Sequence, residues 1–535
     1  MDMKTASHLN SDLILVFDAG TQSVRCALFD TTGTLVDMIK IPIEPYFVPA
    51  PGFHEQHPEY FWQKFCEASQ GLLARNEDLR EHIKAVTLTT QRGVYVNLDR
   101  DGKPLRPAIH WLDQRMADPS KFAPFWLEYG LKAIGLYGVV DTLNRKCFSN
   151  WIRQHQPDVW EKTHKYVLLS GFFHYQLTGV AAESRGSNFG YIPINRKDFG
   201  WAKKNDIIWY AFPMEKDKLP DLVVQGEIIG KVTKQAALET GIPEGIPLAA
   251  GSCDKSCEVL GSGTLTPDIG YLSFGTCATV NAVSTKSVDL LPYLPPYPGA
   301  VPGTYCTEIP IDRGFWLVSW FKEQFGHQEV QLAAERGVSP ESLFEEMIQD
   351  IPPGSNGLML QPYWSPDRVY CDEYGKGAVI GFSDRHTRAH LYRAVLEGII
   401  FALKDGAKIT TDKLGRRFTK LRVSGGGSQS RTALQITADV FNLPVEVPSV
   451  NETGMLGAAM NAAVGLGYYS NYEAAVAGMT SIREVIQPIP RNRDLYEQLY
   501  NRIYRKLYSQ LKPLYKDLAD ITRDFHELVP TDQGR

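Results

Sequence analysis

A turn of small residues between two strand-like segments, near the start of the chain, limits the folds that this sequence can adopt. Leu13-Ile-Leu-Val-Phe17 is an apolar run typical of a buried strand, and Val24-Arg-Cys-Ala-Leu-Phe29 alternates as a second strand. Residues 18–23 form the turn, and a third strand is expected over residues 34–41. P-loop and dinucleotide-binding folds place their glycines between a strand and a helix. This meander therefore indicates a different α/β arrangement.

The same pattern returns in the middle of the chain. Ile269 to Phe274 reads as a strand, Gly275-Thr276 as a turn and Cys277 to Ser284 as a second strand. At 535 residues the chain is also too long for one hydrophobic core. We therefore expect a duplicated architecture of two domains, residues 1–265 and residues 266–535.

Composition and charge narrow the classes of function. Hydrophobic residues make up 43% of the chain and charged residues 22%, which is globular composition. The formal net charge is −5, which argues against a nucleic-acid partner. No apolar run could cross a bilayer and residues 1–12 lack a signal-peptide core, so we expect a cytoplasmic protein without a membrane partner. The eight cysteines contain no Cys-x-x-Cys pair, which favours free thiols over zinc or disulfides.

The first turn carries groups that suit a phosphate. Gly20 lets the backbone approach an anion closely, and the Thr21 and Ser23 hydroxyls could donate hydrogen bonds to phosphate oxygens. Asp18, at the end of the first strand, could hold Mg²⁺ directly or through water. An ordinary Asp-Gly hairpin turn explains the same residues equally well.

A second candidate follows a short apolar strand over residues 246–250. In Gly251-Ser-Cys-Asp254-Lys255, Asp254 is expected at the junction between this strand and a helix. The carboxylate could cap the helix, or it could accept a proton from an attacking hydroxyl. The residues alone leave both roles open.

A third candidate is a run of three glycines, Gly425 to Gly427, between a predicted strand and a predicted helix over residues 434–441. Such a run allows a nucleoside or a phosphate to approach the backbone. A flexible turn is the alternative, but three glycines at the start of a helix are costly unless the space is needed.

A fourth candidate joins two polar segments of the first half. Gln91 and Arg92 follow one strand-like run, and Trp111, Asp113 and Arg115 follow another. The polar groups could bind sugar hydroxyls, and the indole ring could stack on the apolar face of a sugar. Without further context, a surface salt bridge between the aspartate and an arginine is the simpler explanation.

Taken together and in this order, these pieces resemble the FGGY family of carbohydrate kinases, from Leu13 to about Tyr469. The resemblance implies two actin-like (ribonuclease H-like) α/β domains with an ATP and substrate cleft between them. It implies an ATP- and Mg²⁺-dependent kinase that phosphorylates a hydroxyl of a small sugar or polyol, such as a pentulose or an alditol. A homodimer is a further implication.

The resemblance also assigns residues. Asp254 matches the general base, and Asp18 and Asp254 would lie near Mg²⁺. The nucleotide would be bound by Gly20, Thr21, Gln22, Ser23, Arg25, Gly275, Thr276, Gly314, Gly426, Gly427 and Ser430. The sugar would be bound by Gln91, Arg92, Trp111, Asp113, Asp254 and Lys255.

The chain departs from the family pattern at two positions. Glycerol kinases carry an Arg-Glu pair where this chain has Arg92-Gly93, and xylulose kinases tend to carry Met-His. Lys255 replaces a neutral residue after the base, where it could depress the pKa of the carboxylate or bind an anionic substrate group. The substrate is therefore left open.

Two other classes of function fit the same fold. A catalytically weak binding or regulatory protein is disfavoured by the presence of both Asp18 and Asp254. An actin-like assembly ATPase or chaperone is disfavoured by two features. These are the candidate sugar-binding segment at residues 111–115, called the sugar-side segment below, and the glycine turn at residues 425–427.

Overall fold

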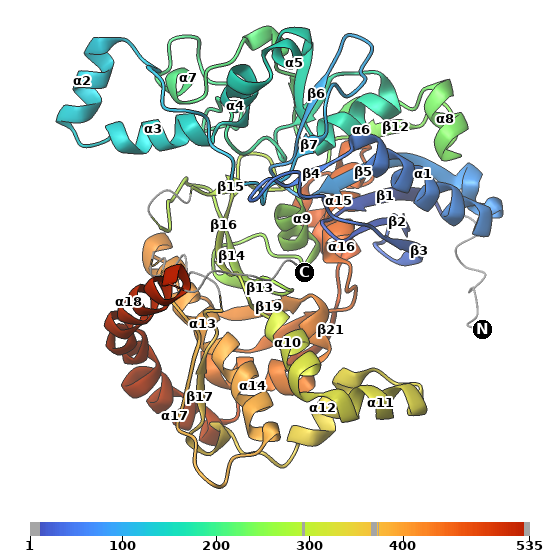
Figure 1. Cartoon of the computed structure of the whole chain (residues 1–535). Coiled ribbons are helices and arrows are strands. Elements are labelled where there is room, and N and C mark those ends of the chain that lie inside the picture. Colours follow the sequence, from blue (N-terminus) through green and yellow to red (C-terminus); the bar gives the residue numbers. More distant parts are fainter. Residues whose placement is uncertain (1–10, 292–294, 365–371, 373, 529–535) are drawn as a thin grey trace.

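The molecule consists of two halves, each built on a large mixed β-sheet covered by helices (Figure 1). The computed structural model describes residues 11–291, 295–364, 372 and 374–528, with side chains as far as residue 522. The α/β class predicted from the sequence is confirmed.

The first sheet combines the predicted meander with parallel strands. Its order is β11-β12-β5-β1-β2-β3, in which β1 is antiparallel to β2 and parallel to β5. These strands are β1 (Leu13–Ala19), β2 (Ser23–Asp30), β3 (Leu35–Pro42), β5 (Ile83–Thr90), β11 (Ile228–Lys231) and β12 (Pro247–Ala249).

The second sheet repeats this topology. Its order is β15-β16-β14-β13-β19-β20-β21, and β13 is again antiparallel to the next strand, β14, and parallel to β19. The repeat confirms the predicted duplication. The strands are β13 (Ile269–Phe274), β14 (Ala278–Ser284), β15 (Tyr297–Pro298), β16 (Tyr305–Ile311), β19 (Lys420–Ser424), β20 (Val445–Pro448) and β21 (Ile482–Ile486).

Smaller sheets and the helices complete the described structure. A four-stranded sheet and two strand pairs contain β4 (Glu55–Gln56), β6 (Tyr95–Leu98), β7 (Ala108–Ile109), β8 (Lys165–Leu168), β9 (Ala182–Ser184), β10 (Asp221–Val223), β17 (Met359–Gln361) and β18 (Ala378–Ile380). The first nine α-helices are α1 (Pro58–Arg75), α2 (Phe125–Ala133), α3 (Tyr137–Lys146), α4 (Phe148–His155), α5 (Pro157–Lys162), α6 (Leu169–Thr178), α7 (Ile208–Ala211), α8 (Lys234–Thr240) and α9 (Asp254–Gly261). The others are α10 (Trp316–Phe325), α11 (His327–Arg336), α12 (Pro340–Ile348), α13 (Arg388–Leu414), α14 (Arg431–Phe441), α15 (Thr453–Gly465), α16 (Tyr472–Met479), α17 (Pro490–Leu499) and α18 (Arg505–Leu528). Short 3₁₀ or π turns are η1 (Glu77–His82), η2 (Lys216–Lys218), η3 (Ser355–Gly357), η4 (Gly426–Gln429) and η5 (Tyr500–Tyr504).

No helix in the described part of the chain combines the length and the apolar character needed to cross a membrane. The cysteines within the described residues are all free thiols, and Cys371 lies outside those residues.

Strand β1 is apolar from Leu13 to Phe17 because helices cover both of its faces. Leu15 and Phe17 pack on the α1 side, where the Phe17 and Phe65 rings stack with their centroids 3.5 Å apart. Ile14 and Val16 point the other way and pack against α15 and α16. A strand buried on both sides cannot show alternation, which explains the continuous apolar run.

Helices α15 and α16 follow the strands of the second sheet in sequence but pack on the first sheet. In Figure 1 they lie as orange helices beside the blue strands β1 and β5. A division at residue 265 thus separates the strands of the two large sheets, whereas the core of the first half also draws on residues 453–479.

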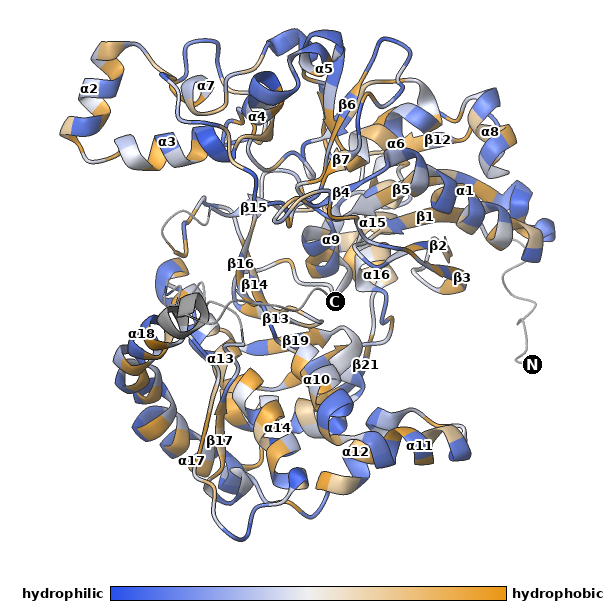
Figure 2. Cartoon of the chain, viewed as in Figure 1, coloured by the Kyte–Doolittle hydropathy of each residue, from blue (hydrophilic) through white to orange (hydrophobic). Residues whose placement is uncertain are grey.

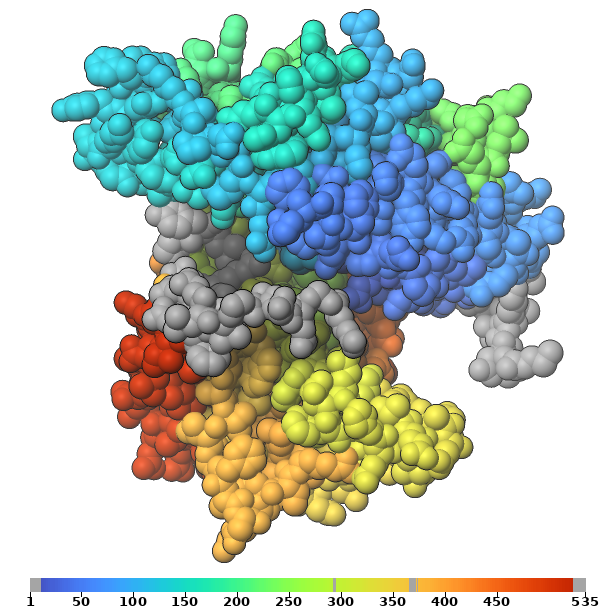
Figure 3. All heavy atoms as spheres, in the orientation of Figure 1, coloured from blue at the N-terminus to red at the C-terminus, as the bar shows by residue number. Residues whose placement is uncertain are grey.

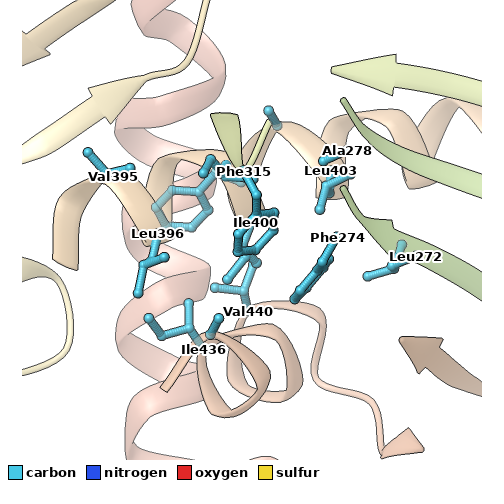
Figure 4. Close-up of a cluster of buried hydrophobic side chains, with 14 of the residues drawn as sticks. Leu272, Phe274, Ala278, Phe315, Val395, Leu396, Ile400, Leu403, Ile436 and Val440 are labelled. Atoms are coloured by element: carbon cyan, nitrogen blue, oxygen red, sulfur yellow. The ribbon is translucent and has the colours of Figure 1, made fainter. Parts of the chain in front are cut away.

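The core of the second half forms where α13 and α14 cover its sheet. Figure 4 shows Phe274 and Leu272 from β13 facing Ile400 of α13 and Val440 of α14. Figure 2 shows how the core is separated from the surface: the strands inside are apolar, and the outer faces of the helices are largely hydrophilic.

Helix α9 lies between the two halves. Its Cys257 and Leu260 pack with the first sheet and α15, whereas Val259 packs against Tyr271 of β13 in the second sheet. The residue that begins this helix, Asp254, is thereby fixed where the two halves meet.

The contact between α9 and α15 depends on glycine. A Cβ atom on Gly457 would overlap the backbone carbonyl of Cys257, and one on Gly261 would overlap that of Thr453. The helix backbones therefore approach more closely than any side chain would permit.

Replacing Gly457 should separate these helices. We expect Gly457→Ala to destabilise the protein by about 1–3 kcal/mol, because its Cβ meets backbone rather than a movable side chain. Gly454→Ala, on the same helix, is the matched control, since its Cβ would lie 3.5 Å from Glu258 Cγ in ordinary contact. Urea unfolding of both variants checks this, and equal stability of the two would contradict it.

Candidate active site

The first hairpin places Asp18 and Arg25 opposite each other across β1 and β2. Arg25 Nη1 lies 3.2 Å from Asp18 Oδ2 and 2.9 Å from Glu452 Oε2, just before α15. The Gly20 N–H donates to the Ser23 carbonyl at 3.1 Å and closes the turn. Gln22, at the tip, is exposed.

Asp18 lies in a region of excess negative charge. Burial raises the pKa of Asp18 to about 7, and Arg25 opposes this rise. The carboxylates of Asp254, Glu452 and Glu258 contribute to this raised value. A cation bound here would relieve this repulsion.

The loop that leads to Asp254 is held by neighbouring strands. The Thr89 hydroxyl of β5 donates to the Ser252 carbonyl at 2.9 Å, and the Ser184 hydroxyl of β9 donates to the Gly251 carbonyl at 2.5 Å. Asp254 is the first residue of α9, and the preceding Cys253 is the N-cap, with no capping bond from its side chain. Asp254 Oδ1 accepts from the Lys255 N–H at 2.7 Å, so the carboxylate satisfies one backbone donor of the first turn of its own helix.

Asp254 is flanked by charges of both signs. Arg92 Nε lies 3.3 Å from Asp254 Oδ1. Burial raises the pKa of Asp254, although Arg92 and Lys255 oppose the rise. The Lys255 Nζ is engaged by both carboxylate oxygens of Glu258 at 2.9 Å, so this ammonium is already paired within the described structure.

Gln91 connects the first hairpin to the sugar-side segment. Its Oε1 accepts from the Thr21 hydroxyl at 3.0 Å and from the Trp111 indole at 3.2 Å. His110 Nε2 lies 3.0 Å from the same oxygen. Burial lowers the pKa of His110 to about 4, so the ring is neutral, and its Nε2–H donates to Gln91 Oε1. With its oxygen occupied, Gln91 has a buried Nε2 without a partner among the described residues, and the same is true of Arg92 Nη1.

Trp111 and Asp113, the other candidates for sugar binding in this segment, differ in whether a ligand can reach them. Trp111 is 46% exposed, so its ring can meet a ligand. Asp113 has no exposed side-chain surface, and its carboxylate accepts from Arg115 at 2.8 and 2.7 Å and from the His54 N–H at 2.7 Å. This is the predicted Asp–Arg salt bridge, but it is buried rather than on the surface. A contact between Asp113 and a ligand would require the pair to break.

The second hairpin is joined to Gly314. The Gly275 and Thr276 carbonyls accept from the backbone N–H groups of Phe315 and Trp316 at 3.1 and 3.2 Å. A Cβ on Gly314 would overlap the backbone of Ala278. The structure therefore brings these three predicted nucleotide-binding residues together, and Thr276 is exposed at the tip.

The three glycines of the turn, Gly425 to Gly427, differ in their backbone conformation and in the space around their Cβ positions. Gly425 has a φ of +96°, and its Cβ would lie 2.9 Å from the Phe274 backbone. A Cβ on Gly427 would overlap the Phe315 ring, whereas Gly426 has nothing within 4 Å of its Cβ position. Only the middle glycine faces open space.

Ser430 is occupied in the described structure. Its hydroxyl caps α14 by accepting from the Ala433 N–H at 3.0 Å, and it donates to Glu345. A ligand could reach Ser430 only in competition with these bonds.

Three glutamates that the sequence reasoning did not single out lie at the site. Glu258 follows Asp254 by one helical turn, a spacing that could have revealed it. Glu452 lies directly before α15, and Glu308 is the only charged residue of β16, Tyr-Cys-Thr-Glu-Ile-Pro-Ile. A lone charge within a buried strand was the available signal for Glu308.

The described residues contain no group of three or more His, Cys, Asp and Glu side chains arranged to hold a metal ion. Mg²⁺ commonly binds through one or two carboxylates together with substrate phosphates. Asp18, with its raised pKa, and the neighbouring Asp254 fit that pattern.

Residues from both halves thus converge on Asp254. The space-filling view shows the blue residues of the first half above the yellow and orange residues of the second (Figure 3). The arrangement provides a buried carboxylate, hydrogen-bond donors without a partner among the described residues, and two turns with backbone groups suited to phosphate.

Known proteins share this organisation over almost the full chain. The sugar kinase YgcE of Escherichia coli (strain K12), described as uncharacterized, is 29% identical over 96% of this chain and 94% of its own length. The xylulose kinase of Lactococcus lactis is 29% identical over 97% of this chain and 99% of its own.

Solved structures show the same fold. A ligand-bound xylulose kinase from Lactobacillus acidophilus has a TM-score of 0.78, with 20% identity over 95% of this chain and 100% of that chain. A xylulose kinase from Rhodospirillum rubrum has a TM-score of 0.76, with 24% identity over 94% of this chain and 100% of that chain. The predicted two-domain actin-like fold is thereby confirmed.

Family models match both halves. The N-terminal domain of the FGGY family of carbohydrate kinases matches residues 13–261, and the C-terminal domain of that family matches residues 270–466. The chain belongs to the FGGY family of carbohydrate kinases.

Proposed function

We propose that this protein transfers the γ-phosphoryl group of ATP to a hydroxyl of a small sugar or polyol, with Asp254 as the general base. The observation that carries the proposal is a pair of buried donors, Gln91 Nε2 and Arg92 Nη1, that have no partner among the described residues, and Arg92 also pairs with that carboxylate. Buried donors without acceptors are costly, and the oxygens of a hydroxylated substrate would satisfy them.

Asp254 is suited to remove the proton of the attacking hydroxyl. Its raised pKa makes the carboxylate a stronger base than an exposed aspartate. The nearby Arg92 keeps it charged and orients it, and the position at the start of α9 fixes it between the halves. Such placement supplies much of the rate enhancement in phosphoryl transfer.

The two hairpins would hold the nucleotide. The backbone N–H groups and hydroxyls around Thr21 and Thr276 can donate to phosphate oxygens. Asp18 and Asp254 would hold Mg²⁺, which neutralises phosphate charge when bound. Gly426 would leave room for the adenosine.

The acceptor is proposed as a ketose such as a pentulose, or an alditol. Named relatives include xylulose kinases and a Bacillus subtilis gluconokinase. Arg92-Gly93 replaces the pairs typical of xylulose and glycerol kinases, so we assign a class of acceptor rather than one sugar. We also propose a cytoplasmic location, since free thiols suit a reducing compartment.

Removal of the base should abolish turnover. We expect Asp254→Asn to lower kcat/KM for the acceptor by about 10²–10⁴-fold while leaving ATP binding intact. ADP release with Mg-ATP, measured across pentuloses, hexuloses, pentitols, tetritols, gluconate and glycerol, checks this. Asp78→Asn makes the same chemical change on an exposed residue and should retain full activity.

The same assay distinguishes the kinase from the alternative, a catalytically weak binding or regulatory protein on the same fold. If no compound raises turnover above the ATP-only rate while ATP still binds, the kinase proposal for these acceptors fails and a regulatory binding protein is favoured. Activity retained by Asp254→Asn would exclude Asp254 as the base.

Stability without ligands should depend on pH through Asp18. The pKa of Asp18 is raised from 3.8 to about 7, so the protonated form favours folding. Relative to Asp18→Asn, the wild type should lose roughly 1–3 kcal/mol between about pH 4 and pH 7 and little above that. Thermal unfolding across this range checks it, and parallel curves would show that Asp18 ionises normally.

The glycine turn offers a paired test of the nucleotide site. Gly426→Val fills open space, so it should raise the KM for ATP about tenfold without lowering stability. Gly425→Ala forces strain at positive φ and should instead destabilise the fold. Unchanged ATP kinetics in Gly426→Val would place the adenosine elsewhere.

A further inference from the structure

A strand pair from the second half reaches the first half beside the site. In Figure 1, β15 and β16 extend toward the upper half of the molecule. The Tyr305 hydroxyl donates to the Lys197 carbonyl at 2.9 Å. The Pro298 carbonyl accepts from Ser256 at 2.5 Å, and the Gly299 carbonyl accepts from Gln225 at 2.8 Å. This strand pair, residues 297–311, is thus held against residues of the first half.

The strand pair delivers one carboxylate to the site. Glu308 on β16 is 6% exposed, and its Oε2 lies 3.1 Å from Arg92 Nη2. Burial alone would raise the pKa of Glu308, but Arg92 and Lys255 lower it below its usual range, with help from the Tyr297 hydroxyl. Glu308 is therefore ionised.

Arg92 consequently bridges carboxylates of both halves. Its Nε faces Asp254, its Nη2 faces Glu308, and the Tyr297 ring lies 4.0 Å from its guanidinium carbon. Only Nη1 is buried without a partner among the described residues. The guanidinium is fixed on several sides and still has one donor to offer.

We propose that Glu308 is a specificity-determining residue, which pairs with Arg92 to bind two neighbouring hydroxyls of the acceptor. Arg92 Nη1 donates to one hydroxyl oxygen, and the Glu308 carboxylate accepts from the adjacent hydroxyl. The inference rests on the proposed kinase function and adds a residue to its acceptor site.

The chemistry of the pair selects a class of acceptor. A donor beside an acceptor matches a vicinal diol, in which each hydroxyl can take the opposite role. The second carboxylate near Arg92 disfavours an anionic acceptor such as a sugar acid. Because Arg92 and Glu308 come from different halves, the diol is recognised only where the halves meet.

The variant Glu308→Gln tests the inference in the full-length enzyme. It keeps the size of the side chain and removes its charge. The KM for the neutral acceptor should rise about 10–100-fold, while the KM for ATP changes little. Glu446→Gln is the matched control, because Glu446 pairs with Arg422 at 2.9 Å in the same sheet. Its KM for the acceptor should stay at the wild-type value.

Deoxy analogues of the active acceptor separate recognition from folding. For the analogue that lacks the hydroxyl bound by Glu308, the ratio of KM between Glu308→Gln and wild type should fall to about one. For the other analogues it should stay high. A purely structural role would raise KM equally for every analogue, and this result, or an unchanged KM, would overturn the inference.

The proposed kinase function and the proposed role of Glu308 would be overturned by different results. Wild-type enzyme that phosphorylates no compound of the panel would overturn the proposed function together with this inference. Active wild-type enzyme with an indistinguishable Glu308→Gln variant would overturn the inference alone.

Discussion

The close contact between α9 and α15 is the constraint on which the rest of the structure depends. Gly261 and Gly457 let the two helix backbones meet, and this contact fastens residues from late in the chain to the first sheet. Helix α9 is then held between both sheets, so Asp254 at its first position cannot move independently of either half. Close packing makes such a position stiff, which suits the base that we propose Asp254 to be.

Around that fixed point, positive and negative groups pair both within and between segments of the chain. Arg25 pairs with Asp18 and Glu452, Lys255 pairs with Glu258, and Arg92 lies between Asp254 and Glu308. Buried charges are stable only when they are paired and hydrogen-bonded. The site is therefore a network, and within the described part of the chain Gln91 Nε2 and Arg92 Nη1 are donors that it leaves without a partner.

Much of this could be predicted from the sequence because the signals were local. The apolar run Leu13 to Phe17, the two strand–turn–strand units and the junction before Asp254 all follow from neighbouring residues, and the structure has each of them. The availability of a side chain was harder to predict, because it depends on the partner that the group takes in the fold. Asp113 and Ser430 carry suitable groups, but the nearby Arg115 and Ala433 and the distant Glu345 occupy them.

The sequence by itself determined the family and the duplicated fold, since backbone preferences and motif order are properties of short segments, and it offered Asp18 and Asp254 as candidate site residues. Only the tertiary structure decided which sheet α15 packs against and which of the three glycines faces open space. It also decided which carboxylate of the other half pairs with Arg92. Glu308 is 216 residues from Arg92 along the chain. Nothing in the intervening sequence encodes that contact, because it arises only when the two sheets are packed against one helix.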